Sequence, residues 1–148
     1  MKFLLDTNVY FAAIYEPRFL DRYRDLLLRI GPLTYLSSVV RFELLQGARG
    51  DLGRARVARA TRQLERTRRI TAPADTDWAR AGIVQGKIWD DLPRLRAKSL
   101  QNDILIACTA RRIGAIVVSD NLRDFQVVSR YLPHRTVSIA TLGQMLGV

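Results

Sequence analysis

Short apolar runs alternate along this chain with longer stretches in which apolar residues recur every three or four positions. The runs occupy residues 3–5, 33–36 and 115–118, and a weaker one spans 136–139. Short, largely apolar runs between polar boundaries are typical of buried strands. We therefore predict four strands, and the first three are each followed by a polar or charged residue.

The stretches between these runs have helical spacing. Thr7 or Asn8 suits the N-cap of a first helix, and Pro17 ends it. Val39, Phe42 and Leu45 are spaced to face a core from one helix. The remaining helices are predicted at residues 20–30, 51–69, 78–92, 104–112, around 124–128 and at 142–146. Short strands alternating with helices predict an α/β fold, a mostly parallel sheet with helices on both faces.

The bulk composition describes an ordinary globular chain. Its 148 residues suit a single domain, 1–148, and 48% of them are hydrophobic. The only cysteine, Cys108, lies in an apolar helix and is expected to be a small buried residue. Neither a signal peptide nor a membrane-spanning stretch is predicted, so we expect a cytoplasmic protein with no membrane partner.

The charge balance is unusual, because 24 Lys and Arg oppose 14 Asp and Glu, giving a formal net charge of +10. Such a surplus favours a polyanionic partner, although a general preference for arginine would produce it too. Four arginines recur at helical spacing and form a candidate track for an RNA backbone: Arg59, Arg62, Arg66 and Arg69. Two other interpretations are a solvated face, with Glu65 paired to Arg69, and a docking surface for an acidic protein.

Acidic residues stand next to apolar segments at several predicted boundaries. Asp6 follows the first strand, Glu43 lies on the helix after the second, and Asp103 opens the helix before the third. A polar turn with Ser119, Asp120, Asn121 and Asp124 follows that third strand. Each has an ordinary interpretation as a cap, a surface residue or a turn former. Together, at the carboxyl ends of parallel strands, they predict an oxygen-lined site for Mg²⁺ or Mn²⁺.

Four segments of the chain, in this order, resemble the PIN-domain ribonucleases, and especially the VapC-type toxins of prokaryotic toxin–antitoxin pairs. They are Leu-Leu-Asp-Thr-Asn-Val at 4–9, Arg-Phe-Glu-Leu at 41–44, Asn-Asp-Ile-Leu-Ile-Ala at 102–107 and Val-Val-Ser-Asp-Asn-Leu-Arg-Asp-Phe at 117–125. The resemblance implies that Asp6, Glu43 and Asp103 are metal-site residues. It also implies a VapB-like antitoxin partner and a homodimer, for which the apolar helices at 9–30 and 38–50 offer a surface.

The chain departs from the family pattern at one position. Many relatives carry Asp two residues after a Ser or Thr, where this chain has Asn121 after Ser119. Asp120 and Asp124 flank that position and could supply the missing charge. Ser119 itself could orient a water molecule at the site. We therefore take Asp6, Glu43, Asp103, Asn121 and Asp124 as candidate catalytic residues. Asp6 and Asp103 are the first candidates to ligate metal, followed by Glu43, Asp120 and Asp124.

The available side chains favour a metal-dependent mechanism. A single histidine, His134, rules out a histidine-pair ribonuclease within one chain. Because only carboxylates and water are then available for the chemistry, a bound divalent ion is needed to generate the nucleophile. We expect hydrolysis of RNA phosphodiesters, leaving a 5′-phosphate as the resemblance implies. Transfer RNA, ribosomal RNA and messenger RNA all remain open as targets.

Two other functions fit parts of the sequence. A non-catalytic PIN-like module that binds RNA or protein is compatible with Asn121. A phosphatase of the haloacid-dehalogenase type would need Asp-x-Asp after the first strand, but the chain has Asn8 at the second position. Phe42, Trp78 and Trp89 have helical core spacing, so we predict that they pack inside the protein rather than stack on bases.

Overall fold

A five-stranded parallel sheet forms the centre of the computed structural model, which describes all residues 1–148. Its strand order is β3-β2-β1-β4-β5. The strands are β1 (Lys2–Leu5), β2 (Thr34–Ser37), β3 (Ile70–Thr71), β4 (Ala115–Val118) and β5 (Thr136–Val137). The predicted α/β class is confirmed. The short edge strand β3 was not predicted, because two partly buried residues leave no recognisable apolar run.

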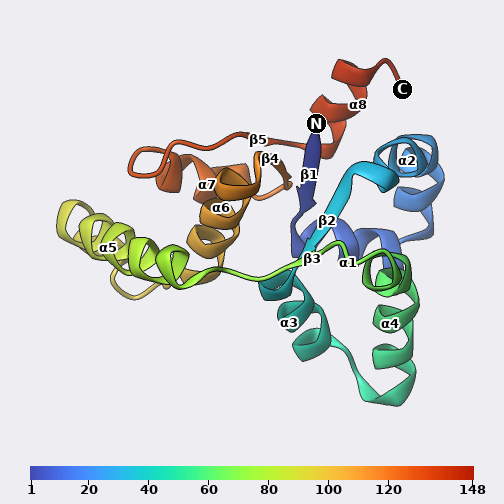
Figure 1. Cartoon of the computed structure of the whole chain (residues 1–148), viewed down its shortest axis with the longest axis horizontal. Helices are drawn as coiled ribbons and strands as arrows, with labels where there is room; N and C mark the ends of the chain where they lie inside the picture. Colours follow the sequence, from blue (N-terminus) through green and yellow to red (C-terminus); the bar gives the residue numbers. More distant parts are fainter.

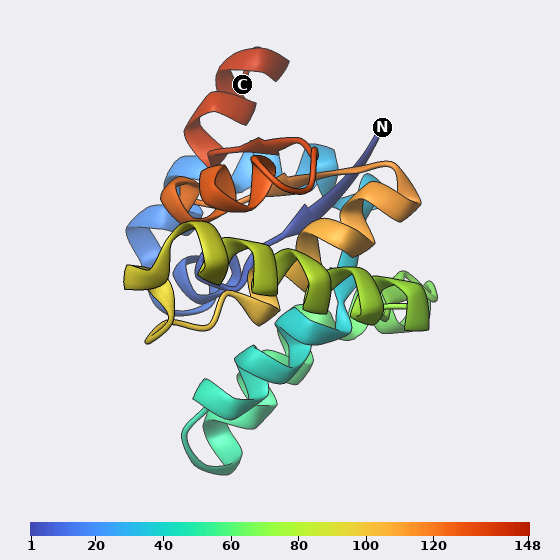
Figure 2. The same ribbon diagram turned by 90° about the vertical axis from the view of Figure 1, so that its left-hand side faces the viewer.

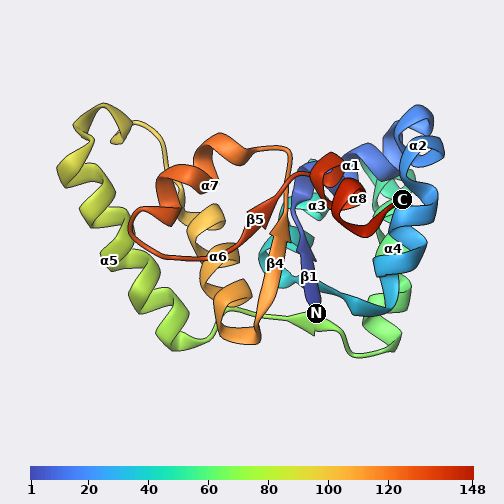
Figure 3. The ribbon, with the colours of Figure 1, turned by 90° about the horizontal axis from the view of Figure 1, so that it is seen from above.

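Eight α-helices surround the sheet (Figure 1). They are α1 (Thr7–Tyr15), α2 (Pro17–Ile30), α3 (Ser38–Gly47), α4 (Gly50–Arg66), α5 (Asp75–Asp91), α6 (Gln101–Ile113), α7 (Leu122–Ser129) and α8 (Ile139–Leu146). Short 3-10 turns occupy Gly31–Leu33 and Pro93–Leu95. Figure 3 shows α5, α6 and α7 on one side of the sheet and α2 and α4 on the other. All predicted helices are present, within a few residues of their expected ends.

The core is built around β1, β4 and α6. Every residue of β4 is buried, as is every α6 residue from 104 to 110, including Cys108. The helix α6 packs on β1 and β4, and α5 packs on α6. Strands covered on both faces need side chains that are apolar on both faces, so they appear in the sequence as continuous apolar runs.

The strand order reverses its direction at β1. From β1 the chain moves outward to β2 and β3, then returns to place β4 on the other side of β1. The amide of Asp6 donates a hydrogen bond to the carbonyl of Val118, 2.9 Å away, so the carboxyl ends of β1 and β4 are level. In open parallel sheets, ligands bind in the crevice beyond such a reversal.

The helices α3 and α4 extend away from the sheet as an antiparallel pair, here called the α3–α4 arm (Ser38–Arg66; Figure 2). The prediction that Phe42 and Leu45 face the core is wrong, since their exposed fractions are 61% and 43%. Val40 and Leu44 are fully buried instead. The helix has apolar residues on both sides, and it leaves the sheet after its first turns.

Two further packing predictions were tested by the fold. Trp78 near the start of α5 is 50% exposed, so its assignment to the core is wrong. Trp89 is partly buried and packs against the core, as predicted. Only one side of the outer helix α5 packs against the rest of the protein. The helical spacing of its apolar residues does not show which of the two tryptophans lies on that side. No helix of the structure combines the length and the apolar character needed to cross a membrane.

Candidate active site at the carboxyl edge of the sheet

Asp6 is held rigidly where β1 passes into α1. It is the N-cap of α1, a position that we had assigned to Thr7 or Asn8, and its Oδ1 accepts a hydrogen bond from the Thr7 amide at 2.8 Å. Only 5% of the residue is exposed. Burial raises the pKa of Asp6, while hydrogen bonds from Ser119 and Thr7 oppose that shift. The cap and a place in the site are therefore compatible roles for one side chain.

Ser119 and Asn8 connect Asp6 to the turn after β4. The Ser119 hydroxyl donates to Oδ2 of Asp6 at 2.7 Å and accepts from the Asn121 amide at 3.0 Å and the Asn8 side chain at 3.1 Å. Asn8 also accepts a hydrogen bond from the Asp120 amide. The only hydroxyl proton of Ser119 is thus directed at Asp6, which leaves none to donate to a water molecule. Asn8 was missed as a site residue because it looks like an ordinary cap.

Glu43 reaches the same edge from the second turn of α3. The Thr7 hydroxyl donates a hydrogen bond to its Oε1 at 2.9 Å, which ties α3 to the start of α1. Burial raises the pKa of Glu43, the Asp6 carboxylate adds to the rise, and the bond from Thr7 opposes it. The role of Thr7 had no sequence signal, because it depends on a contact between positions 36 residues apart.

Asp103 is the most perturbed acid of the site. Burial raises its pKa to about 7, and the Asp6, Asp124 and Glu43 carboxylates contribute to the rise, against a smaller opposing effect of Lys98. A helix that precedes a parallel strand runs antiparallel to it, so the first turn of α6 lies at the carboxyl edge. Four acids, one at the N-cap of α1 and the others on α3, α6 and α7, are therefore close enough to interact. We call this set the acidic edge: Asp6, Glu43, Asp103 and Asp124.

Asp124 differs from the other acids because a lysine neutralises it. The Lys98 ammonium lies 2.8 Å from both carboxylate oxygens, and the Asn121 side chain donates to Oδ2 at 2.9 Å. Burial alone would raise the pKa of Asp124, but the hydrogen bonds from Lys98 and Asn121 together lower it. Asp120 is exposed, and its carboxylate is not among the charges that shift the pKa of Asp103.

The acidic edge offers the right donors for a hard divalent cation, although its side chains are not arranged as a finished ligand set. No three acidic, histidine or cysteine side chains of the chain converge on one point. The crowding that raises the pKa of Asp103 is nevertheless the crowding that a cation would relieve. Carboxylate oxygens also match the preference of Mg²⁺ and Mn²⁺. The residues present therefore fit such an ion by their chemistry and their mutual repulsion.

The predicted arginine track is only partly a surface feature. Arg59, Arg62 and Arg66 are exposed on α4. Arg69 lies beyond the helix, where its guanidinium donates to the carbonyls of Gly31 and Thr34, and it does not belong to the track. The proposed pairing of Glu65 with Arg69 is also wrong, since the nearest cation to Glu65 is Arg41 at 3.9 Å. The candidate track is therefore reduced to three arginines.

His134 lies outside the acidic edge. Its ring packs edge-on against Phe125, with centroids 5.8 Å apart, and its Nδ1 lies 2.8 Å from the Leu132 carbonyl. Burial lowers its pKa. These contacts give the only histidine a packing role and leave the acidic edge to carboxylates, amides and one lysine.

The PIN domain family model matches residues 3–131, a span that contains every residue of the acidic edge. The chain belongs to the PIN domain family. This confirms the resemblance found in the four sequence segments, from the strand β1 with Asp6 to the turn with Asp124. A comparison with curated protein sequences gives no match.

Solved structures of VapBC complexes have the same fold as this PIN domain. DNA-bound VapBC from Salmonella typhimurium matches with 25% identity and a TM-score of 0.61, over 94% of this chain and 98% of that one. VapBC-1 from nontypeable Haemophilus influenzae matches with 23% identity and a TM-score of 0.56, over 95% and 99%. VapBC2 from Rickettsia felis, bound to a promoter DNA fragment, matches with 19% identity and a TM-score of 0.61, over 93% and 98%.

Proposed function

We propose that this PIN domain is a metal-dependent endoribonuclease that hydrolyses RNA phosphodiester bonds. The observation that carries the proposal is the meeting of Asp6, Glu43 and Asp103 at the sheet reversal, with the pKa of Asp103 raised to about 7 by burial and by its acidic neighbours. A fold keeps mutually repelling carboxylates together at a cost, and a bound cation would offset that cost. The chain's net charge of +10 suits a polyanionic substrate.

In this proposal Asp6, Asp103 and Glu43 hold Mg²⁺ or Mn²⁺. When bound, the ion would activate water for attack on phosphorus and offset negative charge on the phosphate. Ser119 and Asn8 fix the orientation of Asp6 through their hydrogen bonds to Oδ2. Lys98 forms an ion pair with Asp124, so Asp124 is not one of the metal ligands in this proposal, and the Lys98 ammonium lies at the rim of the site. Asn121 fixes the Asp124 carboxylate and needs no charge of its own.

Cleavage assays test this proposal directly. Wild type, freed of copurifying partner, is incubated with total RNA and transfer RNA in Mg²⁺, Mn²⁺ or EDTA. Asp103→Asn and Asp6→Asn should each reduce cleavage roughly a thousandfold, because each removes a charged metal ligand. Asp6→Asn keeps the α1 cap, since Asn caps helices as well as Asp does. The exposed Asp25→Asn is the matched control and should retain full activity.

The outcomes separate the alternatives. Cleavage in EDTA, or full activity of folded Asp103→Asn, contradicts the proposal. End analysis of the products should find 5′-phosphates. A folded wild type that binds Mn²⁺ but cleaves neither RNA would support the non-catalytic PIN-like module. That second candidate draws support from Asn121 at the fourth family position and from the neutralisation of Asp124 by Lys98.

We further propose that the chain is the toxin of a toxin–antitoxin pair that acts in the cytoplasm as a homodimer with a VapB-like antitoxin. The three solved structures of similar fold described above are named as VapBC complexes. An apolar groove of about 670 Å³, lined by residues of α1, α2 and α4 such as Val9, Ile14 and Leu28, offers a partner helix a surface. Coexpression with a candidate VapB-like antitoxin, followed by size-exclusion chromatography, tests both the pairing and the dimer.

A further inference from the structure

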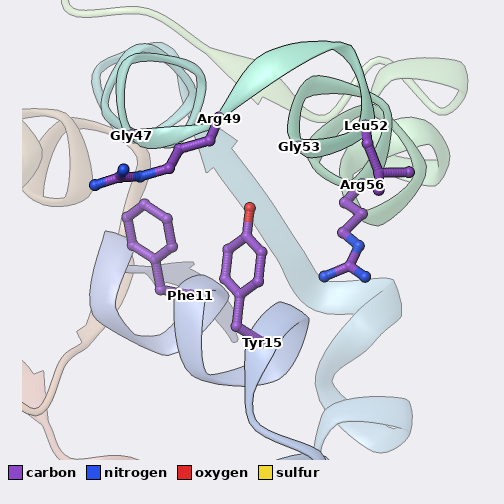
Figure 4. A pocket seen from close by; sticks show the side chains of 7 residues that line it. All are labelled: Phe11, Tyr15, Gly47, Arg49, Leu52, Gly53 and Arg56. Carbon is purple, nitrogen blue, oxygen red and sulfur yellow. The ribbon is translucent and has the colours of Figure 1, made fainter.

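A second pocket lies between α1 and the outer end of the α3–α4 arm, where α3 passes into α4 (Figure 4). Its volume is about 390 Å³. We call it the aromatic–arginine pocket; α1 contributes Phe11 and Tyr15, the end of α3 contributes Gly47, and Arg49, Leu52 and Arg56 come from the start of the α4 region. No acidic residue lines it. Neither Arg49 nor Arg56 forms an ion pair elsewhere in the protein.

The pocket continues the line along which α1 and α3 lie side by side. At its start, the Thr7 hydroxyl bonds to Glu43 of the acidic edge. One turn further along both helices, Phe11 meets Gly47, where an added Cβ would lie 2.7 Å from the tip of the Phe11 ring. Residues four apart share a helix face, and four residues rise about 6 Å along the axis. Tyr15 is one more turn away, so the pocket begins within a nucleotide or two of the carboxylates.

The chemistry of the pocket suits an unpaired nucleotide. The rings of Phe11 and Tyr15 are stacked, with centroids 5.7 Å apart and planes at 27°. The Arg56 guanidinium carbon lies 5.9 Å from the centre of the Tyr15 ring. Figure 4 shows Arg49 and Arg56 on opposite sides of the two aromatic side chains. Single-stranded RNA is bound in this way, with bases on aromatic or guanidinium planes and phosphates beside cations.

We propose that the aromatic–arginine pocket binds a nucleotide of single-stranded RNA adjacent to the phosphate that is cleaved. The base would stack on the Tyr15 ring, with Arg56 moving outward to cover it, and Arg49 would contact a neighbouring phosphate. Tyr15 is 38% exposed and Arg56 is exposed, so both can adjust without disturbing the core. The proposal rests on the proposed ribonuclease function only for the placing of the scissile bond. Binding itself requires no catalysis.

Equilibrium binding in EDTA tests the proposal, because chelation separates RNA binding from metal-dependent cleavage. The probe is a fluorescein-labelled single-stranded RNA of about eight nucleotides, a length suited to one binding groove. Tyr15→Leu, which keeps an apolar side chain, should weaken binding about 5- to 50-fold by removing a stacking surface. Tyr15→Phe should bind as the wild type does. Arg56→Gln should weaken binding. It should also lower the slope of log affinity against log salt by about 0.7, the value for one phosphate contact on a single strand.

A matched control exists on α2, where Phe19, Tyr23 and Arg22 form a similar group away from this pocket. The rings of Phe19 and Tyr23 are 4.8 Å apart, and Arg22 lies 5.2 Å from the centre of the Tyr23 ring. Tyr23→Leu should leave RNA affinity unchanged. Photocrosslinking with 4-thiouridine at successive positions should then attach one position to the peptide that contains Tyr15.

Three results would overturn the proposal. Equal RNA affinities of folded Tyr15→Leu and Tyr23→Leu would show that the pocket takes no base, even if cleavage by the wild type stands. If Tyr15→Leu loses antitoxin binding but keeps its RNA affinity, the pocket binds a peptide of the antitoxin and not a nucleotide. Failure of the wild type to bind the RNA would also overturn it. Conversely, Tyr15-dependent RNA binding by a protein that cleaves nothing would uphold the pocket and reject the ribonuclease function.

Discussion

The acidic edge is enclosed by the packing of the sheet and its helices, whereas the arginines of the α3–α4 arm project into solvent. At the acidic edge, burial and neighbouring carboxylates raise the pKa of Asp103 to about 7. On the arm, Arg59, Arg62 and Arg66 are exposed and free of ion pairs. Like charges cost little where water and salt screen them and much where they are buried. Mutual repulsion is therefore costly at the acidic edge and cheap on the arm.

The largest expected effect comes from removing the charge of Asp103 in the metal-free protein. Because its pKa is higher in the folded state than in the unfolded chain, Asp103 destabilises the fold increasingly as pH rises from about 4 through about 7. Asp103→Asn should therefore raise the free energy of unfolding by up to about 4 kcal/mol at pH 8 in EDTA, and by well under 1 kcal/mol at pH 4.

Urea unfolding at the two pH values measures this difference. The exposed Asp25→Asn serves as the control and should show no dependence on pH. Saturating Mn²⁺ should reverse the order at pH 8, because the wild type alone gains binding energy from the ion. If Asp103→Asn is less stable than wild type at both pH values in EDTA, then the buried acids of the acidic edge do not destabilise the fold by mutual repulsion.

A smaller effect should follow from removing the one cation at the acidic edge. Lys98→Met frees Asp124 and removes a positive charge near any bound metal, so Mn²⁺ affinity measured by titration calorimetry should rise about tenfold. Arg94→Met, a neighbouring loss of charge on an exposed side chain, should change it little. Weaker Mn²⁺ binding by Lys98→Met would instead mean that Lys98 holds Asp124 in a ligating position.

The smallest effects should appear on the arm. If the track contacts RNA, Arg62→Gln and Arg66→Gln should each lower the slope of log affinity against log salt by about 0.7. Arg69→Gln provides the contrast, since its guanidinium bonds to the carbonyls of Gly31 and Thr34. It should cost about 1 kcal/mol of stability without changing the slope. Unchanged slopes for both Arg62→Gln and Arg66→Gln would show that this face of α4 is a solvated surface.

Much of the fold follows from local patterns that the structure confirms. Strands β1 and β4 were predicted from apolar runs. The helix α6 ends at Gly114, whose φ of 71° is the left-handed conformation that glycine adopts readily. The packed face of α3 was predicted wrongly. Phe42 and Leu45 satisfy helical spacing as well as Val40 and Leu44 do, so spacing alone could not choose between them. That choice depends on where the helix leaves the sheet.

The candidate site divides in the same way. Asp6, Glu43 and Asp103 were found from the sequence because acids beside apolar segments are costly and therefore noticeable. Thr7 and Asn8 went unrecognised as site residues, because each acts through a partner distant in the sequence: Glu43 and Ser119 respectively. Arg69 shows the converse error, since it continues the spacing of the track but bonds to backbone carbonyls beyond the helix.

The sequence by itself determined the α/β class, the family and the three acids, since these depend on local spacing and on residue type. Only the tertiary structure decided that Asp124 is neutralised by Lys98, that Ser119 directs its proton to Asp6, and that Phe11 and Tyr15 open onto a pocket beside Glu43. The physical reason is that charge, hydrogen bonding and exposure depend on distances between segments. Those distances are set by how the strands order themselves and how the helices pack on them.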